Sequence, residues 1–304
     1  MYALLKKLCS LHSPSGNEQP MQDFLLSYIE QNKSNWKTSP QLFYGDDFQH
    51  CIVLVFGNPR TACYAHIDNI GFTVRYGNEL VKIGGPKLVS GYILTGSDSL
   101  GAIECTLQVA DEKQLTYKFN REIDRGTDLS FKMNWREDDE YIQSCYMDNR
   151  LGVLNALKLC ESLENGAIVF SCWEEHGGGS VPFIAKFLYD QYKIKQALIS
   201  DITWITEGVH HGKGVVVSLR DSGIPRRVFV NRIMHCLDKN NIAYQKEIES
   251  SGGSDGNELQ KQPYPIDWCF VGAAEDLVHS PDEKVHKKDI ESMLLAYEIL
   301  MREL

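Results

Sequence analysis

The chain lacks several features that would place a protein in a class at once. No stretch approaches the roughly 18 consecutive apolar residues of a transmembrane helix. None of the nine cysteines belongs to a C-x-x-C pair, which excludes the common zinc-finger and dithiol redox motifs. Lys and Arg number 31 against 41 Asp and Glu, a formal net charge of −10, and this deficit of positive charge argues against a nucleic-acid partner. The opening MYALLKKLCSLHSPSG has no long apolar run or cleavage site, so we expect neither a signal peptide nor a membrane partner.

The composition that is present is that of a folded globular protein. Hydrophobic residues make up 43% of the 304 residues and charged residues 24%, and this length suggests about two domains. The cysteines are odd in number, and several lie inside apolar runs, where a free thiol packs as a small hydrophobe. A reducing compartment suits them, so we expect a cytoplasmic protein.

Apolar runs alternate with helical patterns in two parts of the chain, residues 1–70 and 141–304. Strand–helix alternation predicts an α/β fold with a mostly parallel, mixed sheet flanked by helices. The strands are expected at 51–57, 61–68, 167–173, 196–203 and 266–272, and the helices at 1–11, 17–32, 150–163, 180–192, 225–239 and 288–304.

Residues 71–140 have a different sequence pattern from the rest of the chain. Short β-rich segments such as GAIECTLQVA and LTYKFN are separated by Gly, Asn, Asp and Lys turns. This pattern predicts a small all-β, barrel-like domain inserted into the chain. We therefore expect a catalytic domain formed by 1–70 and 141–304, interrupted by the insert at 71–140.

Side chains able to bind metal follow the predicted strands. Because ligand sites of open α/β sheets lie at the carboxyl ends of strands, these side chains are expected to converge. Asp148, which opens the helix after the insert, is expected at the same crevice. The strand-end residues are His66 and Asp68, Glu174 and Glu175, Asp201, and, after a short loop, His279.

The residue types match metal-assisted hydrolysis. Imidazole and carboxylate ligands suit zinc, and two histidines with three carboxylates serve two ions when one carboxylate bridges them. Paired ions stabilise the attacking water and the developing oxyanion, and a glutamate next to a ligating one is placed to act as general base. A single strand-end carboxylate is more often a helix cap or an ion-pair partner. The joint occurrence of these residues after successive strands favours the metal site.

Around these residues the sequence resembles the M42 family of metal-dependent aminopeptidases, within the clan of dizinc exopeptidases. The similarity covers most of the chain and includes an inserted β domain. The motifs that carry it, in the family's order, are SPSGNE (13–18), AHIDNIGFTV (65–74), MDNRLG (147–152), CWEEHGG (172–178), SDIT (200–203) with GKGVVVSLRDSG (212–223), SGGSDG (251–256) and HSP (279–281).

The resemblance implies a role for each candidate. Asp148 would bridge two divalent metal ions, zinc in the first place, with cobalt or manganese as substitutes. Glu174 would be the general base, and Asp68 would orient His66. The enzyme would remove N-terminal residues from short peptides and form a large homo-oligomer. The terminal ligands would be His66, Glu175, Asp201 and His279.

The sequence departs from the family pattern at two places. Asn149 stands where the family usually has a second Asp after the bridging one, and an amide can still form hydrogen bonds. The segment EDLVHSP (275–281) replaces an Arg-Tyr pair that the family often has before the His. Glu275 and Asp276 would there place negative charge at the substrate pocket and favour a basic N-terminal residue. The alternative is that both are solvated loop charges.

Three other functions remain open from the sequence. A related dizinc hydrolase that removes N-acyl groups or C-terminal residues would carry the same metal ligands. A serine hydrolase is suggested by Gly252–Gly256, which fits G-x-S-x-G and is followed by Asp267 or Asp276 and then His279, although no apolar strand precedes it. A non-catalytic binding protein would be marked by loss of the base or of Asp148, and both are present.

Overall fold

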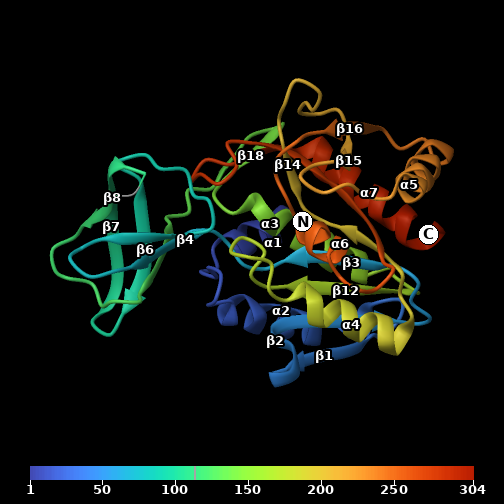
Figure 1. Cartoon of the computed structure of the whole chain (residues 1–304), viewed down its shortest axis with the longest axis horizontal. Coiled ribbons are helices and arrows are strands. Elements are labelled where there is room, and N and C mark those ends of the chain that lie inside the picture. Colours follow the sequence, from blue (N-terminus) through green and yellow to red (C-terminus); the bar gives the residue numbers. More distant parts are fainter. Residues whose placement is uncertain (113) are drawn as a thin grey trace.

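The structure, a computed structural model, describes residues 1–112 and 114–304. Figure 1 shows a large body in which helices surround a sheet, with a smaller sheet projecting from one side. Each body has its own cluster of buried apolar side chains. The expected α/β fold class with an additional all-β unit is confirmed.

The described residues of the large body form a 12-stranded mixed sheet. Its centre is parallel, in the order β12–β3–β13–β17, and its flanks are mainly antiparallel. Its strands are β1 (Gln41–Gly45), β2 (Gln49–Phe56), β3 (Ala62–His66), β10 (Arg136–Glu137), β11 (Tyr141–Gln143), β12 (Gly166–Ser171), β13 (Gln196–Ile199), β14 (Ile202–Trp204), β15 (Val215–Arg220), β16 (Tyr244–Ile248), β17 (Asp267–Asp276) and β18 (Lys284–His286).

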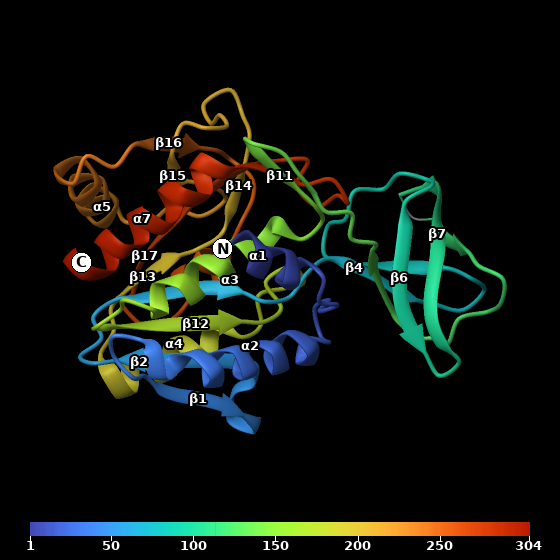
Figure 2. The ribbon, with the colours of Figure 1, turned by 180° about the vertical axis from the view of Figure 1, so that it is seen from behind.

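Helices cover both faces of this sheet. Figures 1 and 2, seen from opposite sides, show α4 and α6 on one face and α3 and α7 on the other. Coverage on both faces explains why every residue of β3 and β12 is buried and why these strands are apolar up to their last residues, His66 and Ser171. The helices are α1 (Tyr2–Cys9), α2 (Gln19–Asn32), α3 (Met147–Cys160), α4 (Val181–Tyr192), α5 (Arg227–Lys239), α6 (Asp255–Gln260) and α7 (Lys287–Glu303), with 3-10 turns at Lys33–Asn35 and Asp46–Phe48.

The smaller sheet is antiparallel throughout, in the order β5–β4–β9–β6–β7–β8. Along β7 buried and exposed residues alternate, which is the period-two pattern of a strand with one face on a core. A bridge between Glu79 and Thr116 brings the two outer strands together, which makes the sheet barrel-like. Its strands are β4 (Gly71–Val74), β5 (Leu80–Ile83), β6 (Ile93–Asp98), β7 (Gly101–Asp111), β8 (Gln114–Lys118) and β9 (Asp128–Phe131).

Three differences between the observed and the expected elements bear on the site. The strand expected over 196–203 is two strands, β13 and β14, separated at Ser200–Asp201. The chain returns to the large sheet before residue 140, because β10 pairs with β11 and β11 with β18. Strands β15 and β16 pair with each other beside β17, and we did not expect them.

Candidate metal centre

The candidate residues meet where the central strands end. His66 is the last residue of β3, Glu174 and Glu175 follow β12, and Asp201 lies in the break between β13 and β14. These parallel strands present their carboxyl ends at one edge of the sheet, so the side chains that follow them share one crevice.

Asp148 and His279 enter the crevice from loops. Asp148 precedes the regular part of α3, with backbone angles outside the helical range. His279 lies in the turn after β17 with a φ of 63°, which few residues other than glycine adopt. Its backbone N–H donates to Glu283 Oε1 (2.9 Å), and its carbonyl accepts from the N–H of Lys87 (2.8 Å). Contacts on both sides of the peptide therefore hold this turn.

Asp148 lies between the two histidines and links two groups of possible ligands. Its Oδ1 is 3.1 Å from His66 Nε2, and its Oδ2 is 3.2 Å from His279 Nε2. Asp201 Oδ2 lies 3.6 Å from His66 Nε2, and Glu175 Oε2 lies 3.2 Å from His279 Nε2. Two triads, His66–Asp148–Asp201 and Asp148–Glu175–His279, thus bring their ligand atoms within 4.8 Å of one another and share Asp148.

The Nδ1 atoms of His66 and His279 each face a fixed hydrogen-bond acceptor. His66 Nδ1 lies 3.4 Å from Asp68 Oδ1, and His279 Nδ1 lies 3.1 Å from the Gly85 carbonyl. Asp68 is buried and accepts hydrogen bonds from Ser15 Oγ (2.6 Å) and from the backbone N–H groups of Glu174 and Glu175 (3.2 and 3.1 Å). This arrangement turns each Nε2 toward the shared aspartate, as in carboxylate–histidine–metal sites.

The ionisable groups of the triads strongly shift one another's pKa values. Burial lowers the pKa of the His66 imidazole, but nearby carboxylates, Asp201 first, outweigh burial and raise it well above its usual value. At His279 burial also lowers the pKa, yet Glu175 and Asp148 raise it to about 12. Burial works to raise the pKa of Asp148, but hydrogen bonds to His279 and His66 outweigh it and lower the pKa. The carboxylates therefore favour positive charge at both Nε2 atoms.

The donor set fits divalent cations. Glu175 Oε1 is buried and has no hydrogen-bond partner among the described residues, an arrangement that is costly unless a ligand satisfies it. Two imidazole nitrogens and three carboxylates are the ligands of N/O metal sites, and metal ions replace the protons that such groups hold. The centre thus has the composition and the charge of a two-cation site.

Glu174 lies beside the triads but outside both. Its Oε2 is 3.9 Å from His66 Nε2, and its side chain is 18% exposed. Burial raises the pKa of its carboxyl well above the usual value, and Asp201, Glu175 and Asp255 add to the rise while His66 opposes it. Its buried position therefore favours the protonated form of this carboxyl more than water does.

The start of α3 packs tightly on the backbone that carries Asp201. Asn149 is fully buried, and its Nδ2 donates to the Ser200 carbonyl (2.9 Å) while its Oδ1 accepts from the Gly152 N–H (2.8 Å). The next residue, Arg150, is also fully buried and donates to the carbonyls of Ile67 (2.8 Å) and Asp68 (3.2 Å). These two side chains tie Asp148 to the strands that carry the other ligands.

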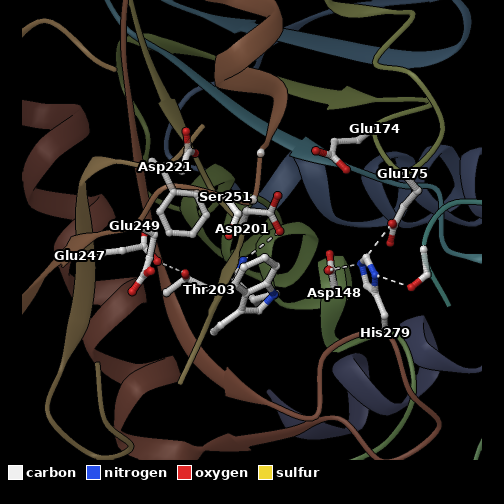
Figure 3. A pocket seen from close by; sticks show the side chains of 16 residues that line it. Asp148, Glu174, Glu175, Asp201, Thr203, Asp221, Glu247, Glu249, Ser251 and His279 are labelled. Carbon is white, nitrogen blue, oxygen red and sulfur yellow. Dashed lines mark hydrogen bonds and ion pairs between the residues drawn. The ribbon is translucent and has the colours of Figure 1, made fainter. Parts of the chain in front are cut away.

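The triads open into a cavity of about 250 Å³ with acidic and apolar walls (Figure 3). In Figure 3, Asp148, Glu175 and His279 lie on one side, and Glu247 and Glu249 lie on the other, with Asp221 near them. Sequence reasoning missed these three carboxylates. No motif joins them, and they are carried by β15, β16 and the loops after these strands, which we did not expect.

Glu275 and Asp276, proposed from the sequence as pocket charges, do not line this cavity. Glu275 is fully buried near the end of β17, and burial raises its pKa well above the usual value. Asp276 is exposed, and its Oδ1 accepts a hydrogen bond from the Leu277 N–H (2.8 Å). The negative charge at the pocket therefore comes from other residues.

The contacts of Ser254 are those of a helix cap. Its hydroxyl accepts from the Gly256 N–H (3.2 Å), while the Asn257 side chain accepts from the Ser254 N–H (2.7 Å) to complete a capping box for α6. Asp267, one candidate partner, pairs instead with Arg226 (2.5 Å). No described residue gives Ser254 an imidazole partner, so its contacts do not favour a serine nucleophile.

The chain resembles known aminopeptidases over its whole length. The family model described as M42 glutamyl aminopeptidase matches residues 106–295. A protein of Acetivibrio thermocellus named "Putative aminopeptidase" is 26% identical over 324 residues, which is 95% of each chain.

Within residues 1–112 and 114–304, every helix is too short or too polar to form a transmembrane span.

Solved structures share the fold at lower identity. An aminopeptidase from the archaeon Desulfurococcus kamchatkensis superposes with a TM-score of 0.87 at 21% identity, over 99% of this chain and 94% of its own. The TET1 peptidase of Pyrococcus horikoshii, which can assemble into a tetrahedron or a large octahedral shell, has a TM-score of 0.82 at 21% identity, over 100% and 99%. With the family model covering more than half of its length, this chain belongs to the M42 family of peptidases and is a peptide hydrolase of the aminopeptidase type.

Proposed function

We propose that this enzyme is a two-metal aminopeptidase that removes N-terminal residues from short peptides. The observation that carries the proposal is the pair of triads joined at Asp148. Four carboxylates, Asp148, Glu174, Glu175 and Asp201, match the formal charge of two divalent cations. Zinc suits this N/O donor set best, and cobalt and manganese suit it next.

Each residue of the centre has a proposed task. His66 and Asp201 would hold one cation, Glu175 and His279 the other, and Asp148 would bridge them. When bound, such a pair lowers the pKa of water and polarises a carbonyl group. Asp68 would keep the His66 ring in the orientation that turns Nε2 inward.

Glu174 would move the proton. Its carboxylate lies at the edge of the triads, so it can accept a proton from the attacking water and pass the proton to the leaving amine. The raised pKa of Glu174 supports this role, because burial makes its carboxylate a stronger base than an exposed one.

We also propose that the inserted residues 71–140 form a domain separate from the catalytic residues 1–70 and 141–304, and that the enzyme is a cytoplasmic homo-oligomer. The separate apolar cluster of the small sheet and the assemblies of the TET1 relative support these proposals. An enclosed assembly would admit short peptides and exclude folded proteins.

A panel of aminoacyl 4-nitroanilides with N-acetylated counterparts tests the activity, before and after chelation. The proposal expects cleavage of only the free-amine substrates and loss of cleavage with chelator. Cleavage of the blocked substrates would instead identify an acyl hydrolase, and cleavage of C-terminal residues a carboxypeptidase. Activity that survives chelation would refute a metal mechanism.

A matched pair of variants tests the roles. Glu174→Gln should keep the metal content and lower kcat by about 10²- to 10⁴-fold, since the proton carrier is lost but the ligands remain. Asp148→Ala should lose both metal and turnover, because Asp148 belongs to both triads. Metal analysis of the purified proteins separates the two outcomes, and a Glu174→Gln enzyme with wild-type kcat would contradict the assignment.

A further inference from the structure

The wall of the cavity opposite Asp148 and His279 is built from two adjacent strands. Strands β15 and β16 run parallel, with Ser218 opposite Glu247. Asp221 follows β15, and Glu249 follows β16, so their carboxylates and that of Glu247 gather at one end of the strand pair (Figure 3). Glu247 is 5% exposed and Asp221 is 7% exposed. These are buried charges at the side of the cavity away from the shared aspartate.

The contacts of these carboxylates are with neutral groups. Glu247 accepts a hydrogen bond from the Thr203 hydroxyl. Asp221 Oδ1 accepts from the Gly223 N–H (2.5 Å) and from Asn257 Nδ2 (3.3 Å). Among the described residues, none of the ion pairs to Lys or Arg involves Asp221, Glu247 or Glu249.

Arg220, the basic residue before Asp221 in the chain, forms no ion pair with these carboxylates, although its charge acts to lower the pKa of Asp221. Arg220 is exposed, and its Nε donates to the backbone carbonyl of Asp221 at 3.5 Å rather than to a carboxylate. Burial raises the pKa of Glu247 and that of Asp221, which reflects the cost of holding an unpaired carboxylate away from water.

Apolar side chains complete the cavity. Ile202, Trp204 and Phe270 line it together with the acidic wall. A pocket with apolar sides and buried carboxylates suits a side chain with a methylene stem and a cationic head. A buried carboxylate is stabilised by such a partner and is costly without one.

We propose that this wall binds the side chain of an N-terminal Lys or Arg, so that the enzyme prefers peptides with a basic first residue. The inference rests on the proposed aminopeptidase function, because it assigns the wall to the side chain of the residue that is removed. The apolar residues contact the methylene stem, and Asp221, Glu247 and Glu249 receive the ammonium or guanidinium group. An N-terminal Glu would meet three like charges and be the poorest substrate.

Lysyl and norleucyl 4-nitroanilides test the inference directly, because norleucine has the same stem without the ammonium group. A charge-assisted hydrogen bond predicts that kcat/KM for lysine exceeds that for norleucine by about ten- to a hundredfold. The ratio should fall as salt is added, and the glutamyl substrate should be the slowest. Equal rates for lysine and norleucine, or a preference for the glutamyl substrate, would overturn the inference.

Two variants test whether the preference for lysine over norleucine depends on the wall. Glu247→Gln keeps the shape of the wall and should lower the lysine-to-norleucine ratio of kcat/KM about tenfold. Asp276→Asn is the matched control, since Asp276 is an exposed carboxylate outside the cavity, and it should leave the ratio unchanged. An unchanged ratio in Glu247→Gln, or the same fall in Asp276→Asn, would contradict the assignment.

Binding by calorimetry separates this inference from the proposed function. Lysinamide should bind the wild-type protein at least about tenfold more tightly than norleucinamide, whether or not any anilide is cleaved. If leucyl and norleucyl substrates are cleaved and the two amides bind equally, the preference is wrong and the aminopeptidase activity stands. If no free-amine substrate is cleaved but lysinamide binds selectively, the activity is wrong and the cation-binding wall stands.

Discussion

The methyl group that Gly152→Ala would add has no room in the structure. An ideal Cβ at Gly152 would lie 1.9 Å from the Ser200 carbonyl oxygen and 2.2 Å from Asn149 Oδ1. The first of these atoms belongs to the backbone next to Asp201, and the second to the residue after Asp148. Helix α3 therefore approaches the β13–β14 break so closely that only glycine fits at this point.

The cost of this substitution can be worked from its contacts. Overpacking of a tight core costs about 1–3 kcal/mol. The shift would also weaken the hydrogen bonds that Asn149 forms with Ser200 and Gly152, at about 1 kcal/mol each. The higher helix propensity of Ala relative to Gly offsets about 1 kcal/mol of this destabilisation. We therefore expect a net loss of about 2–4 kcal/mol in the free energy of unfolding.

Urea unfolding in excess chelator measures this loss without the contribution of bound metal. Gly208→Ala serves as the control, because a Cβ at Gly208 has no atom within 4 Å and the residue does not have a positive φ. Because Ser200 and Asn149 adjoin two ligands, Gly152→Ala should also bind metal more weakly, measured by titration. A Gly152→Ala protein that matches Gly208→Ala in both stability and metal affinity would refute the packing argument.

Two further substitutions test the surroundings of the centre. Asn149→Asp removes the Nδ2 donor and sets a buried carboxylate against the Ser200 carbonyl. We therefore expect the free energy of unfolding, measured in urea at pH 7, to fall by about 2–4 kcal/mol. Wild-type stability in this variant would contradict the hydrogen-bond assignment. Burial raises the pKa of Asp255 from 3.8 to about 6, against a hydrogen bond from Ser171 and the charge of His66. The folded state therefore holds a proton there that the unfolded state releases, and stability falls as pH rises from about 4 to about 6. Measured against Asp255→Asn, the wild type should lose about 3 kcal/mol across this window, and parallel pH profiles would show that Asp255 does not titrate in it.

The sequence could predict that the candidate ligands converge because their positions follow from the sheet. Mostly apolar strands such as β3 and β12 are easy to recognise, and the residues at the carboxyl ends of parallel strands must share one edge. The wall of the cavity could not be predicted in this way. Along β16 the one buried residue is Glu247, so the strand has no apolar alternation to reveal it, and its charge suggests a surface segment.

Charge alone was a misleading guide near His279. Glu275 and Asp276 shortly precede it in sequence, yet one is enclosed by the fold and the other faces solvent. Their positions depend on the pairing of β17 with β18, where Glu275 lies opposite Val285 and Asp276 opposite Lys284. Such pairing is a tertiary property that a single run of residues does not encode. The positions of these two residues therefore do not support the hypothesis that they charge the cavity, whose far wall instead carries Asp221, Glu247 and Glu249.

The loop between β5 and β6 of the small sheet is a structural part of the candidate metal centre. After β5, the Gly85 carbonyl lies 3.1 Å from His279 Nδ1, and the Lys87 N–H donates to the His279 carbonyl at 2.8 Å. In the same segment, the Gly84 N–H donates to Nδ1 of His176, next to Glu175, at 3.0 Å. His66 and Asp148 precede and follow the small sheet in the chain. The small sheet thus lies between two candidate ligands in sequence while its β5–β6 loop contacts a third, so the geometry of the candidate centre depends on that loop as well as on the large sheet.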